Sequence, residues 1–341
     1  MEEVSIIGID LAKRSFQVHG AKADGSVAYR RKLSRGKLLP FLASEPRCTV
    51  AMEACASAHH WGREIMALGH EVRLVPPIYV KPFVKRHKND AADAEAITEA
   101  AQRPTMHFVV VKSEAQQAQG MLFHTRDLLV RQRTQTINAL RGHLAEYGVV
   151  APQGRARIGQ LAGVLNDEDS GLPKAVVELG RLLLGRIDEL DGKINGLDEK
   201  IRTSARQNEE TARLMKIPGI GPITAMALQA FAPPMESFRR GRDFSAWLGL
   251  VPRQHTTGGK PRLGKISKMG QRDLRRLLIT GATAVVRQAI RRGETTDPWL
   301  ARMLARKPRM LVAVALANRT ARIVWALSTT KEAYRAHTAA A

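Results

Sequence analysis

Five short strand-like segments near the start of the chain constrain its fold more than any other feature. They span residues 4–9, 13–19, 27–32, 48–52 and 71–75. The first and fourth are apolar runs, the second alternates in polarity, the third follows an Asp-Gly turn, and the fifth stops at Pro76, all of which are typical of strands. Residues 57–68 have helical spacing, and the Ala- and Glu-rich stretch 90–101 also indicates a helix. This order predicts an α/β domain with a mixed sheet.

Acidic residues stand at the ends of these predicted elements. Asp10 ends the first run, Glu53 follows the fourth, and Asp90 and Asp93 are three residues apart in the predicted helix. The three-residue spacing places both aspartates on one helical face. A carboxylate cluster suits Mg²⁺, which prefers oxygen ligands and keeps waters that a phosphate can replace. Taken singly, each residue also has an ordinary explanation as a helix cap or a solvated strand end.

Three short motifs around these residues resemble a known family. GIDLAK contains Asp10, MEAC contains Glu53, and HKNDAADAEAI contains both aspartates of the predicted helix. Together they resemble the RuvC-like, RNase H-fold domain of the DEDD transposases of the insertion sequence 110 family. The resemblance implies one or two Mg²⁺ ions held by Asp10, Glu53, Asp90 and Asp93. It also implies contact of Lys88 and Asn89, the usual lead-in residues, with the nucleic-acid backbone or the metal shell.

A second cluster of polar residues lies far from these carboxylates in the sequence. Residues 256–276 read TTGGKPRLGKISKMGQRDLRR, in which two hydroxyl side chains precede a Gly-Gly turn and many cations. A glycine turn allows close backbone approach, so the stretch suits a loop that lies against a nucleic-acid backbone. The nucleic-acid contacts expected here are Lys260, Arg262, Lys265, Ser267, Lys268, Arg272, Arg275 and Arg276.

The longer segment GLVPRQHTTGGKPRLGKISKMGQRDLRRLL is similar to the C-terminal signature of the same family, in its subgroup 1111. The resemblance implies a hydroxyl that attacks DNA and forms a covalent phosphoester, as in an RNA-guided serine-type recombinase. The family uses serine where this chain has threonine. Alignment from GLVP favours Thr257, whereas alignment from ISK favours Thr256, which we prefer. Ser267 is the reserve candidate.

The middle of the chain indicates long helices. Residues 113–147 form one candidate, and residues 148–159 interrupt the helical pattern. Beyond them, apolar residues recur in alternating steps of four and three, which is a heptad seam. The seam consists of Leu183, Ile187, Leu190, Ile194, Leu197 and Ile201. It requires either the preceding helix or a second copy of the chain as its partner, and the family resemblance favours a dimer or tetramer.

A glycine-rich turn opens the last third of the chain. The sequence IPGIGP at 217–222 precedes a predicted helix over 223–231. Free N–H groups at a helix start are a natural phosphate site. The motif resembles a helix-hairpin-helix element, in which Gly219 and Gly221 contact the DNA backbone, although the same residues also suit an ordinary tight turn. Further helices are expected over 244–250, from 270 onward and over 311–327, the last as a core helix.

The charge balance indicates a polyanionic partner. The 341-residue chain contains 54 Lys and Arg against 32 Asp and Glu, a net charge of +22. Neutralising phosphates with such cations releases counterions and favours nucleic-acid binding. A hydrophobic content of 44% supports folded cores rather than disorder. A generically basic soluble protein is the alternative explanation of the charge.

The rest of the composition points to the cytoplasm or the nucleoid. Cys48 and Cys55 are the only cysteines and have no metal-ligand spacing, so we expect reduced thiols. The acidic start MEEVSIIGID does not resemble a signal peptide. We find no uninterrupted apolar run of the roughly 18–20 residues that a membrane span needs, and expect no membrane partner.

These observations combine into a three-part chain. We expect a RuvC-like domain over 1–110, a helical or coiled-coil segment over 111–205, and a mainly helical C-terminal transposase domain over 206–341. The favoured function is a Mg²⁺-dependent transposase or site-specific recombinase, guided by a structured noncoding RNA that the family implies. One alternative is a Holliday-junction nuclease that uses water as its nucleophile. The other is a non-catalytic nucleic-acid-binding scaffold.

Overall fold

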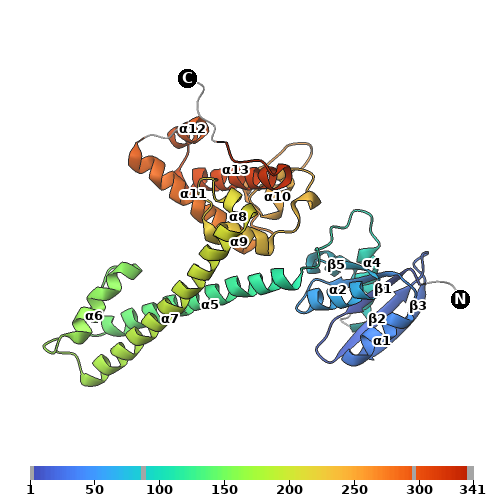
Figure 1. The fold of residues 1–341 in the computed structure, drawn as a ribbon, viewed down its shortest axis with the longest axis horizontal. Helices are drawn as coiled ribbons and strands as arrows, with labels where there is room; N and C mark the ends of the chain where they lie inside the picture. The colour runs from blue at the N-terminus through green and yellow to red at the C-terminus, as the bar shows by residue number, and fades with distance from the viewer. Residues whose placement is uncertain (1–3, 86–89, 294–296, 336–341) are drawn as a thin grey trace. The chain divides into compact units, whose positions relative to one another are not determined.

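A computed structural model describes residues 4–85, 90–293 and 297–335, without the side chains of residues 90 and 156. The chain divides into two compact units, Met1–Gln117 and Ala118–Ala341. Figure 1 shows the fold of both units.

The first unit is built on one five-stranded sheet. Its strands are β1 (Ile6–Asp10), β2 (Ser15–Ala21), β3 (Val27–Ser34), β4 (Thr49–Glu53) and β5 (Glu71–Val75). Their order across the sheet is β3-β2-β1-β4-β5. The β1–β2 and β2–β3 pairs are antiparallel, whereas the β1–β4 and β4–β5 pairs are parallel. The predicted mixed α/β domain is therefore confirmed.

Helices cover both faces of this sheet. They are η1 (Arg35–Lys37), α1 (Leu38–Ser44), α2 (Ala58–Ala67), α3 (Pro77–Val80), η2 (Lys81–Phe83) and α4 (Asp90–Ala101). On one face, Ile7 and Ile9 of β1 pack in a core with Leu38 of α1 and Trp61 of α2. On the other face, Ile6 packs in a smaller core that includes residues of α4. The alternation of side chains along a strand explains why neighbouring residues of β1 enter different cores.

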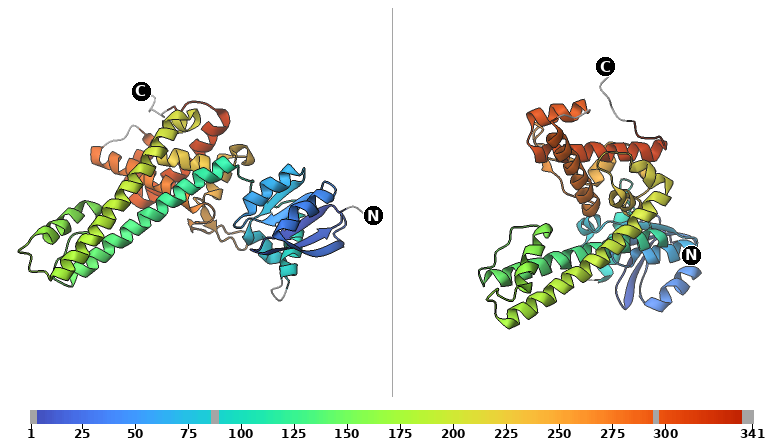
Figure 2. Two further views of the ribbon diagram at one scale, coloured as in Figure 1. Left: turned by 60° about the horizontal axis from the view of Figure 1, so that its bottom comes forward. Right: turned by 60° about the vertical axis from the view of Figure 1, so that its left-hand side comes forward.

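The second unit contains a long antiparallel helix pair. It comprises α5 (Glu114–Ala145) and α7 (Lys174–Gln207), with η3 (Arg155–Arg157) and α6 (Ile158–Asn166) in the connection. Figure 2 shows the two long helices side by side. Arg126 binds Asp198 and Arg133 binds Asp191, so residues of rising number in α5 meet residues of falling number in α7.

Most of the heptad seam is buried within the chain, and Leu183 and Leu197 are half-buried. Ile187 packs in one cluster with Ile137 and Leu140 of α5, and Leu190 and Ile194 are also buried. Of the two partners expected from the sequence, the preceding helix is the one observed. The long helices therefore bury most of this seam against each other.

The remainder of the second unit is a helical body with one small hairpin. Its helices are α8 (Glu209–Leu214), α9 (Pro222–Phe231), η4 (Met235–Ser237), α10 (Gly241–Trp247), α11 (Arg272–Arg292), α12 (Pro298–Arg306) and α13 (Arg309–Thr330). The strands β6 (Pro252–Gln254) and β7 (Leu263–Ile266) form the hairpin. The mostly helical character of this part agrees with the sequence-based prediction.

Helix α13 is a core helix despite its length and composition. Among the helices that the structure describes, it alone is long and apolar enough to cross a membrane. Val312, Ala317, Ala321 and Val324 are nevertheless fully buried in the main core of the second unit. Their burial agrees with the core position expected from the sequence.

Several elements were not expected from the sequence. The short helices α1, α6 and α12 and the strands β6 and β7 have no strong periodic signal because each is brief or mostly exposed. The hairpin strands lie in a stretch that the sequence indicated as a loop, and every residue of β6 is exposed. Their pairing is fixed by backbone hydrogen bonds rather than by an apolar pattern.

Candidate active site and nucleic-acid interface

Two of the predicted carboxylates lie at the same edge of the sheet. Asp10 ends β1 and Glu53 ends β4, and these strands are parallel neighbours in which Ile9 pairs with Met52. The next position along each strand is therefore Asp10 beside Glu53. Asp10 lies two residues after Gly8, and Glu53 lies two residues after Ala51. Because side chains alternate between faces along a strand, both carboxylates lie on the sheet face covered by α4. Both are half-buried.

Helix α4 approaches this face unusually closely at Gly8. A Cβ atom at Gly8 would overlap Thr98 Oγ1 and lie 2.5 Å from the carbonyl oxygen of Ala94. The absent side chain thus lets the backbone of α4 rest against β1. Asp93, the residue before Ala94, is half-buried. Asp90 begins the helix, but its side chain lies outside the described residues, as do Lys88 and Asn89.

The far end of α4 fixes its direction. The Ala101 carbonyl accepts a hydrogen bond of 3.1 Å from Arg73, which lies on β5 opposite Ala51. Ala100 and Ala101 share a core with Ile6, at the start of β1. The last turn of α4 is therefore near the amino ends of the parallel strands. Its first turn, with Asp93, lies toward the carboxyl ends that hold Asp10 and Glu53.

The electrostatics of this edge reflect the two carboxylates. Burial raises the pKa of the Cys55 thiol, and the negative charges of Glu53 and Asp10 raise it further. Cys55 therefore lies within electrostatic range of both. Among the side chains described, no three His, Cys, Asp or Glu groups come close enough to hold a metal ion. The assignment of all four carboxylates as ligands therefore stays a prediction.

A charged network also anchors α4 to β3. The sequence did not indicate this network. Glu95 accepts hydrogen bonds from Arg30 of β3 at 2.9 Å and from Lys85, in the segment before α4. These cations keep the pKa of the Glu95 carboxyl below its usual value, Lys85 contributing most. His19 of β2 is buried nearby, and burial lowers its pKa. Because these residues lie far apart in the sequence, no local pattern predicted the network.

The predicted nucleophiles lie on the exposed tip of the β6–β7 hairpin. Thr256 and Thr257 are both exposed, and Gly258 and Gly259 have positive φ angles of 57° and 73°. The turn closes where the Lys260 N–H donates to the Thr257 carbonyl at 3.1 Å. The expected tight glycine turn is confirmed. It is the tip of an antiparallel hairpin rather than a loop.

Cations lie along the hairpin, and the reserve nucleophile lies at its base. Exposed side chains on the hairpin and just beyond it are those of Lys260, Arg262, Lys265, Lys268 and Arg272. Ser267 is half-buried at the end of β7, where its N–H donates to the Val251 carbonyl at 2.8 Å. Its hydroxyl accepts a long contact of 3.5 Å from the Met269 N–H. Thr256 and Thr257 are thus the more accessible alcohols.

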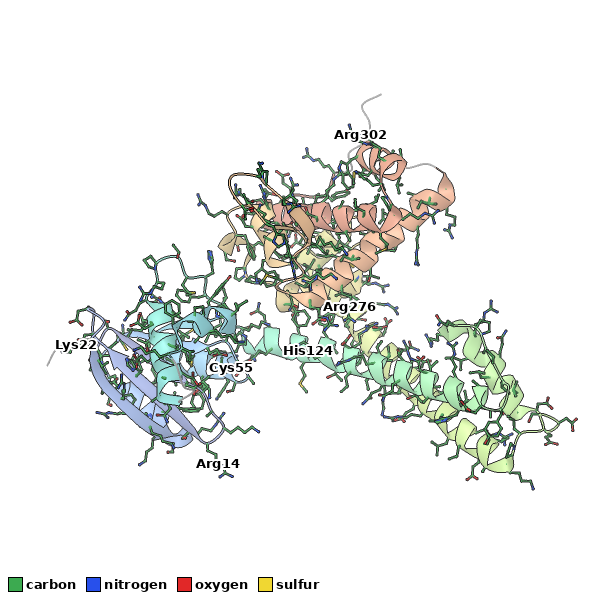
Figure 3. All side chains as sticks on the ribbon, turned by 180° about the vertical axis from the view of Figure 1, so that it is seen from behind. Arg14, Lys22, Cys55, His124, Arg276 and Arg302 are labelled. Atoms are coloured by element: carbon green, nitrogen blue, oxygen red, sulfur yellow. The ribbon has the colours of Figure 1, made fainter. Side chains whose placement is uncertain are left out.

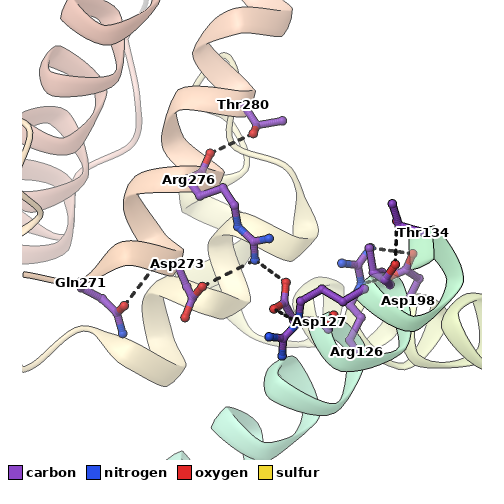
Figure 4. Close-up of polar contacts among 10 residues, drawn as sticks. Arg126, Asp127, Thr134, Asp198, Gln271, Asp273, Arg276 and Thr280 are labelled. Atoms are coloured by element: carbon purple, nitrogen blue, oxygen red, sulfur yellow. Dashed lines mark hydrogen bonds and ion pairs between the residues drawn. The ribbon is translucent and has the colours of Figure 1, made fainter. Parts of the chain in front are cut away.

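Two of the predicted phosphate contacts serve the protein itself in this structure. Arg275 is 9% exposed and donates to the carbonyls of Leu248 and Met269 at 2.9 and 3.0 Å. Burial lowers its pKa. Arg276 forms an ion pair of 2.7 Å with Asp127 of α5 and lies 3.6 Å from Asp273 (Figure 4). Arg275 therefore holds the base of the hairpin, and Arg276 joins α11 to α5.

The glycine-rich turn between α8 and α9 is only partly available to a ligand. Gly221 is exposed at the start of α9, as a phosphate contact requires. Gly219 is half-buried, and its backbone packs against Gly281 of α11, where a Cβ would overlap the Gly219 carbonyl oxygen. Helices α8 and α9 flank the turn, and its assignment as a helix-hairpin-helix element stays a prediction.

Comparisons with known proteins agree with the two separate motif regions. Residues 7–149 match a family model for DEDD transposases of the IS110 type, which covers Asp10, Glu53, Asp90 and Asp93. Residues 211–296 match a second model, described as the transposase IS116/IS110/IS902 family, which covers the hairpin and α11.

Similar proteins extend this agreement to almost the whole chain. The chain is 48% identical to a "Probable family 20 transposase" of Pseudomonas aeruginosa over 97% of its own length and 99% of the relative. It is 42% identical to the transposase for insertion sequence element IS1328 of Yersinia enterocolitica, with 96% and 98% covered. It is 40% identical to the transposase for IS1111A of Coxiella burnetii, with 98% and 92% covered.

The relatives are transposases, which implies DNA as a partner of this chain. Transposases of the DEDD type typically depend on metal ions. The protein belongs to the IS110 family of insertion-sequence transposases.

Proposed function

We propose that this transposase cleaves and rejoins DNA with a Mg²⁺-dependent carboxylate site and a threonine nucleophile. The observation that carries the proposal is the position of Asp10 and Glu53 at the carboxyl ends of adjacent parallel strands, on the face covered by α4. The strand order β3-β2-β1-β4-β5 supports an RNase H-like, RuvC-like assignment for this domain. We retain the three-part division of the chain at residues 110 and 205 as part of this proposal.

The residues at the sheet edge fit Mg²⁺ in their chemistry. Asp10, Glu53, Asp90 and Asp93 offer only carboxylate oxygens, the donors that this hard cation prefers. Two of them share an edge and a face of the sheet, and α4 directs its first turn toward that edge. When bound there, one or two Mg²⁺ ions would neutralise the phosphate and stabilise the attacking and leaving oxygens.

The hairpin supplies the nucleophile in this proposal. Thr256 Oγ attacks the phosphorus and forms a new P–O bond, while the bond from phosphorus to one sugar oxygen breaks. The hydroxyl proton leaves Oγ, and the departing sugar oxygen takes up a proton. Attack by a sugar hydroxyl on the protein–DNA phosphoester then rejoins DNA and releases the threonine. The exposure of Thr256 and the adjacent positive charge of Lys260 and Arg262 support this role.

The proposal includes partners beyond the DNA of the element ends and target. The net charge of +22 accommodates a structured noncoding guide RNA as well as DNA. Assembly as a dimer or tetramer would bring several carboxylate edges and hairpins to the exchanging strands. The phosphate-contacting residues proposed are Lys88, Asn89, Gly219, Gly221, Lys260, Arg262, Lys265, Ser267, Lys268, Arg272 and Arg276, whereas the buried Arg275 holds the hairpin base. A cytoplasmic or nucleoid location follows from these partners.

Trapping of a covalent protein–DNA adduct tests the nucleophile. Cleaved substrate is denatured, and the adduct is detected by its mass and mapped by peptide sequencing. We expect Thr256→Ala to abolish the adduct and leave DNA binding intact, whereas Thr257→Ala and Ser267→Ala retain it. An adduct lost only in Thr257→Ala or Ser267→Ala would move the nucleophile to that residue.

The same assay separates the rival functions. Asp10→Ala and Glu53→Ala are expected to abolish cleavage without abolishing DNA binding. Cleavage that needs Asp10 but leaves no adduct would indicate water as the nucleophile, as in a junction nuclease. Full function of both carboxylate variants would indicate a non-catalytic scaffold.

A further inference from the structure

A row of side chains extends from the carboxylate edge to the outer strand of the sheet. Asp10 of β1 lies directly opposite Gln17 of β2, and Gln17 lies directly opposite Lys32 of β3. Directly opposed residues point to the same face of a sheet. Lys32 is exposed, so the row ends in an exposed cation on the same face and at the same edge as Asp10.

The loop after Asp10 adds further positive charge at this edge. Lys13 and Arg14, between β1 and β2, are both exposed. The Arg35 N–H donates to the Arg14 carbonyl at 3.3 Å, which joins this loop to the end of β3. The Arg35 guanidinium lies 5.1 Å from the centre of the Trp61 ring, so this cation is held at the same end of the sheet but toward the face covered by α2. We call Lys13, Arg14, Lys32 and Arg35 the basic rim.

Few acidic residues lie near the basic rim in the sequence. Residues 11–44 contain eight Lys and Arg and one acidic residue, Asp24. Asp24 lies in the β2–β3 turn, at the opposite end of the sheet from the rim. Arg30, in the next row of the same face, is instead paired with Glu95. Among the described residues no ion pair engages a rim cation, so the rim presents an unneutralised charge that suits a polyanion.

We infer that the basic rim binds the sugar–phosphate backbone of the DNA strand whose phosphate reacts at the carboxylate edge. The inference rests on the proposed role of Asp10 and Glu53. DNA is the expected occupant because the rim continues the edge at which these carboxylates would act on DNA. The strand would cross the ends of β1, β2 and β3.

The geometry of the sheet predicts which phosphate Lys32 serves. Two interstrand spacings of about 4.8 Å separate the backbones of Asp10 and Lys32 by about 10 Å. One DNA strand carries a phosphate about every 3.4 Å along the helix axis. For a duplex whose axis runs along this row, Lys32 therefore serves a phosphate about three positions from the reacting one.

A charge-matched pair of variants tests the rim in the full-length protein. Arg14→Gln with Lys32→Gln removes two rim cations, and Lys22→Gln with Arg47→Gln removes one Lys and one Arg from the opposite end of the sheet. Figure 3 shows Arg14 and Lys22 at opposite ends of the sheet. Binding of a labelled DNA duplex is measured by fluorescence anisotropy across a salt series.

The expected result is a difference in salt dependence between the two doubles. The slope of log affinity against log salt should fall by about 1.8 in the rim double, at about 0.9 for each phosphate that is no longer neutralised. The control double should keep the slope of the unaltered protein. Equal slopes in the two doubles would overturn the inference, because charge would then act without regard to position. Circular dichroism checks that both double variants are folded. If the rim double is unfolded, the single Lys32→Gln variant is used in its place.

Neutral phosphates locate the position at which Lys32 binds. Two DNAs each carry one methylphosphonate, at the third phosphate on one side or on the other side of the mapped cleavage position. One of these two substitutions should weaken binding of the unaltered protein. The same substitution should not weaken binding of Lys32→Gln any further. A rim double that loses affinity for RNA of the same sequence, yet keeps its affinity for DNA, would overturn the choice of DNA.

Asp10→Ala separates this inference from the proposed function. That variant should lose cleavage and keep the salt slope of the unaltered protein. If it does so while the rim double binds DNA normally, the rim inference alone fails. If Asp10→Ala still cleaves DNA, the proposed carboxylate site fails, whatever the rim double shows.

Discussion

Gly8 determines how closely the acidic helix α4 approaches the strand that carries Asp10. The nearest atoms to a Cβ at this position belong to Thr98 and to the Ala94 backbone, which is part of the helix itself. Because the helix backbone cannot move aside independently, a larger residue must displace α4 as a whole. The displacement would carry Asp93 away from the sheet edge.

Gly8→Ala is therefore expected to destabilise the protein by about 1–3 kcal/mol, the usual cost of overpacking. It should also reduce DNA cleavage through the shift of α4. Urea unfolding followed by circular dichroism measures the first effect. Gly36→Ala is the matched control, because a Cβ at Gly36 meets no atom within 4 Å. Equal stability of the two variants would contradict the close-packing argument.

Arg275 acts at the same scale on the hairpin. Its guanidinium bonds carbonyls on both sides of the hairpin, at Leu248 and Met269. Gly249 and Gly270 lie beside these residues with positive φ angles of 70° and 76°, and a Cβ at either would overlap the backbone opposite. The two chain segments at the base of the hairpin are thus held at close backbone contact.

Arg275→Met should loosen the hairpin base, because a buried carbonyl that loses its donor costs about 1–3 kcal/mol. We expect faster hydrogen exchange at the N–H groups of Ser267 and Lys268, which pair with Val251 and Gly249. Arg272→Met removes an exposed cation of the same helix. It should leave these exchange rates unchanged and weaken DNA binding instead. Similar exchange in both variants would argue against Arg275 as the anchor.

At the scale of elements, α5 and α7 stabilise each other through a buried seam flanked by ion pairs. Leu190 is fully buried in that seam, whereas Leu182, on the same helix, is 64% exposed. Asp191 accepts hydrogen bonds from both Arg133 of α5 and Arg155 before α6. The pair is therefore held by apolar burial inside and charge at its borders.

Leu190→Ala should lower the free energy of unfolding by about 2–5 kcal/mol, the cost of a cavity in a packed core. Leu182→Ala should change it by less than about 0.5 kcal/mol, because its side chain is already in water. Chemical denaturation of the two variants under identical conditions makes the comparison. A small effect of Leu190→Ala would mean that the seam is not a rigid core.

At the scale of the whole molecule, the net charge of +22 should dominate the strength of nucleic-acid binding. Cations occur in both units, on the basic rim of the first and on the hairpin of the second. Such a distribution favours many simultaneous phosphate contacts. It also makes binding sensitive to competing salt.

We expect DNA affinity to fall about 10³- to 10⁵-fold between about 50 and 200 mM salt, as for six to ten phosphate contacts. Titration of a labelled duplex at several salt concentrations tests this. Thr256→Ala serves as the control, since removal of an uncharged hydroxyl should not alter the slope. A nearly flat salt dependence would contradict the electrostatic account.

The sequence by itself determined the α/β and helical halves, the positions of the long helices and the family. These features depend on local periodicity and on short motifs, which are written along the chain. It also indicated Asp10 and Glu53 as strand-end residues, because each follows an apolar run. The heptad pattern likewise showed that a buried seam exists, but left its partner open.

Only the tertiary structure decided which distant residues meet. It paired β1 with β4, so that Asp10 and Glu53 share an edge, and aligned Lys32 with Asp10 through Gln17. It also buried Arg275, which the sequence grouped with the phosphate-binding cations. Register and burial depend on contacts between residues far apart in the chain, and a single sequence carries no local signal for them.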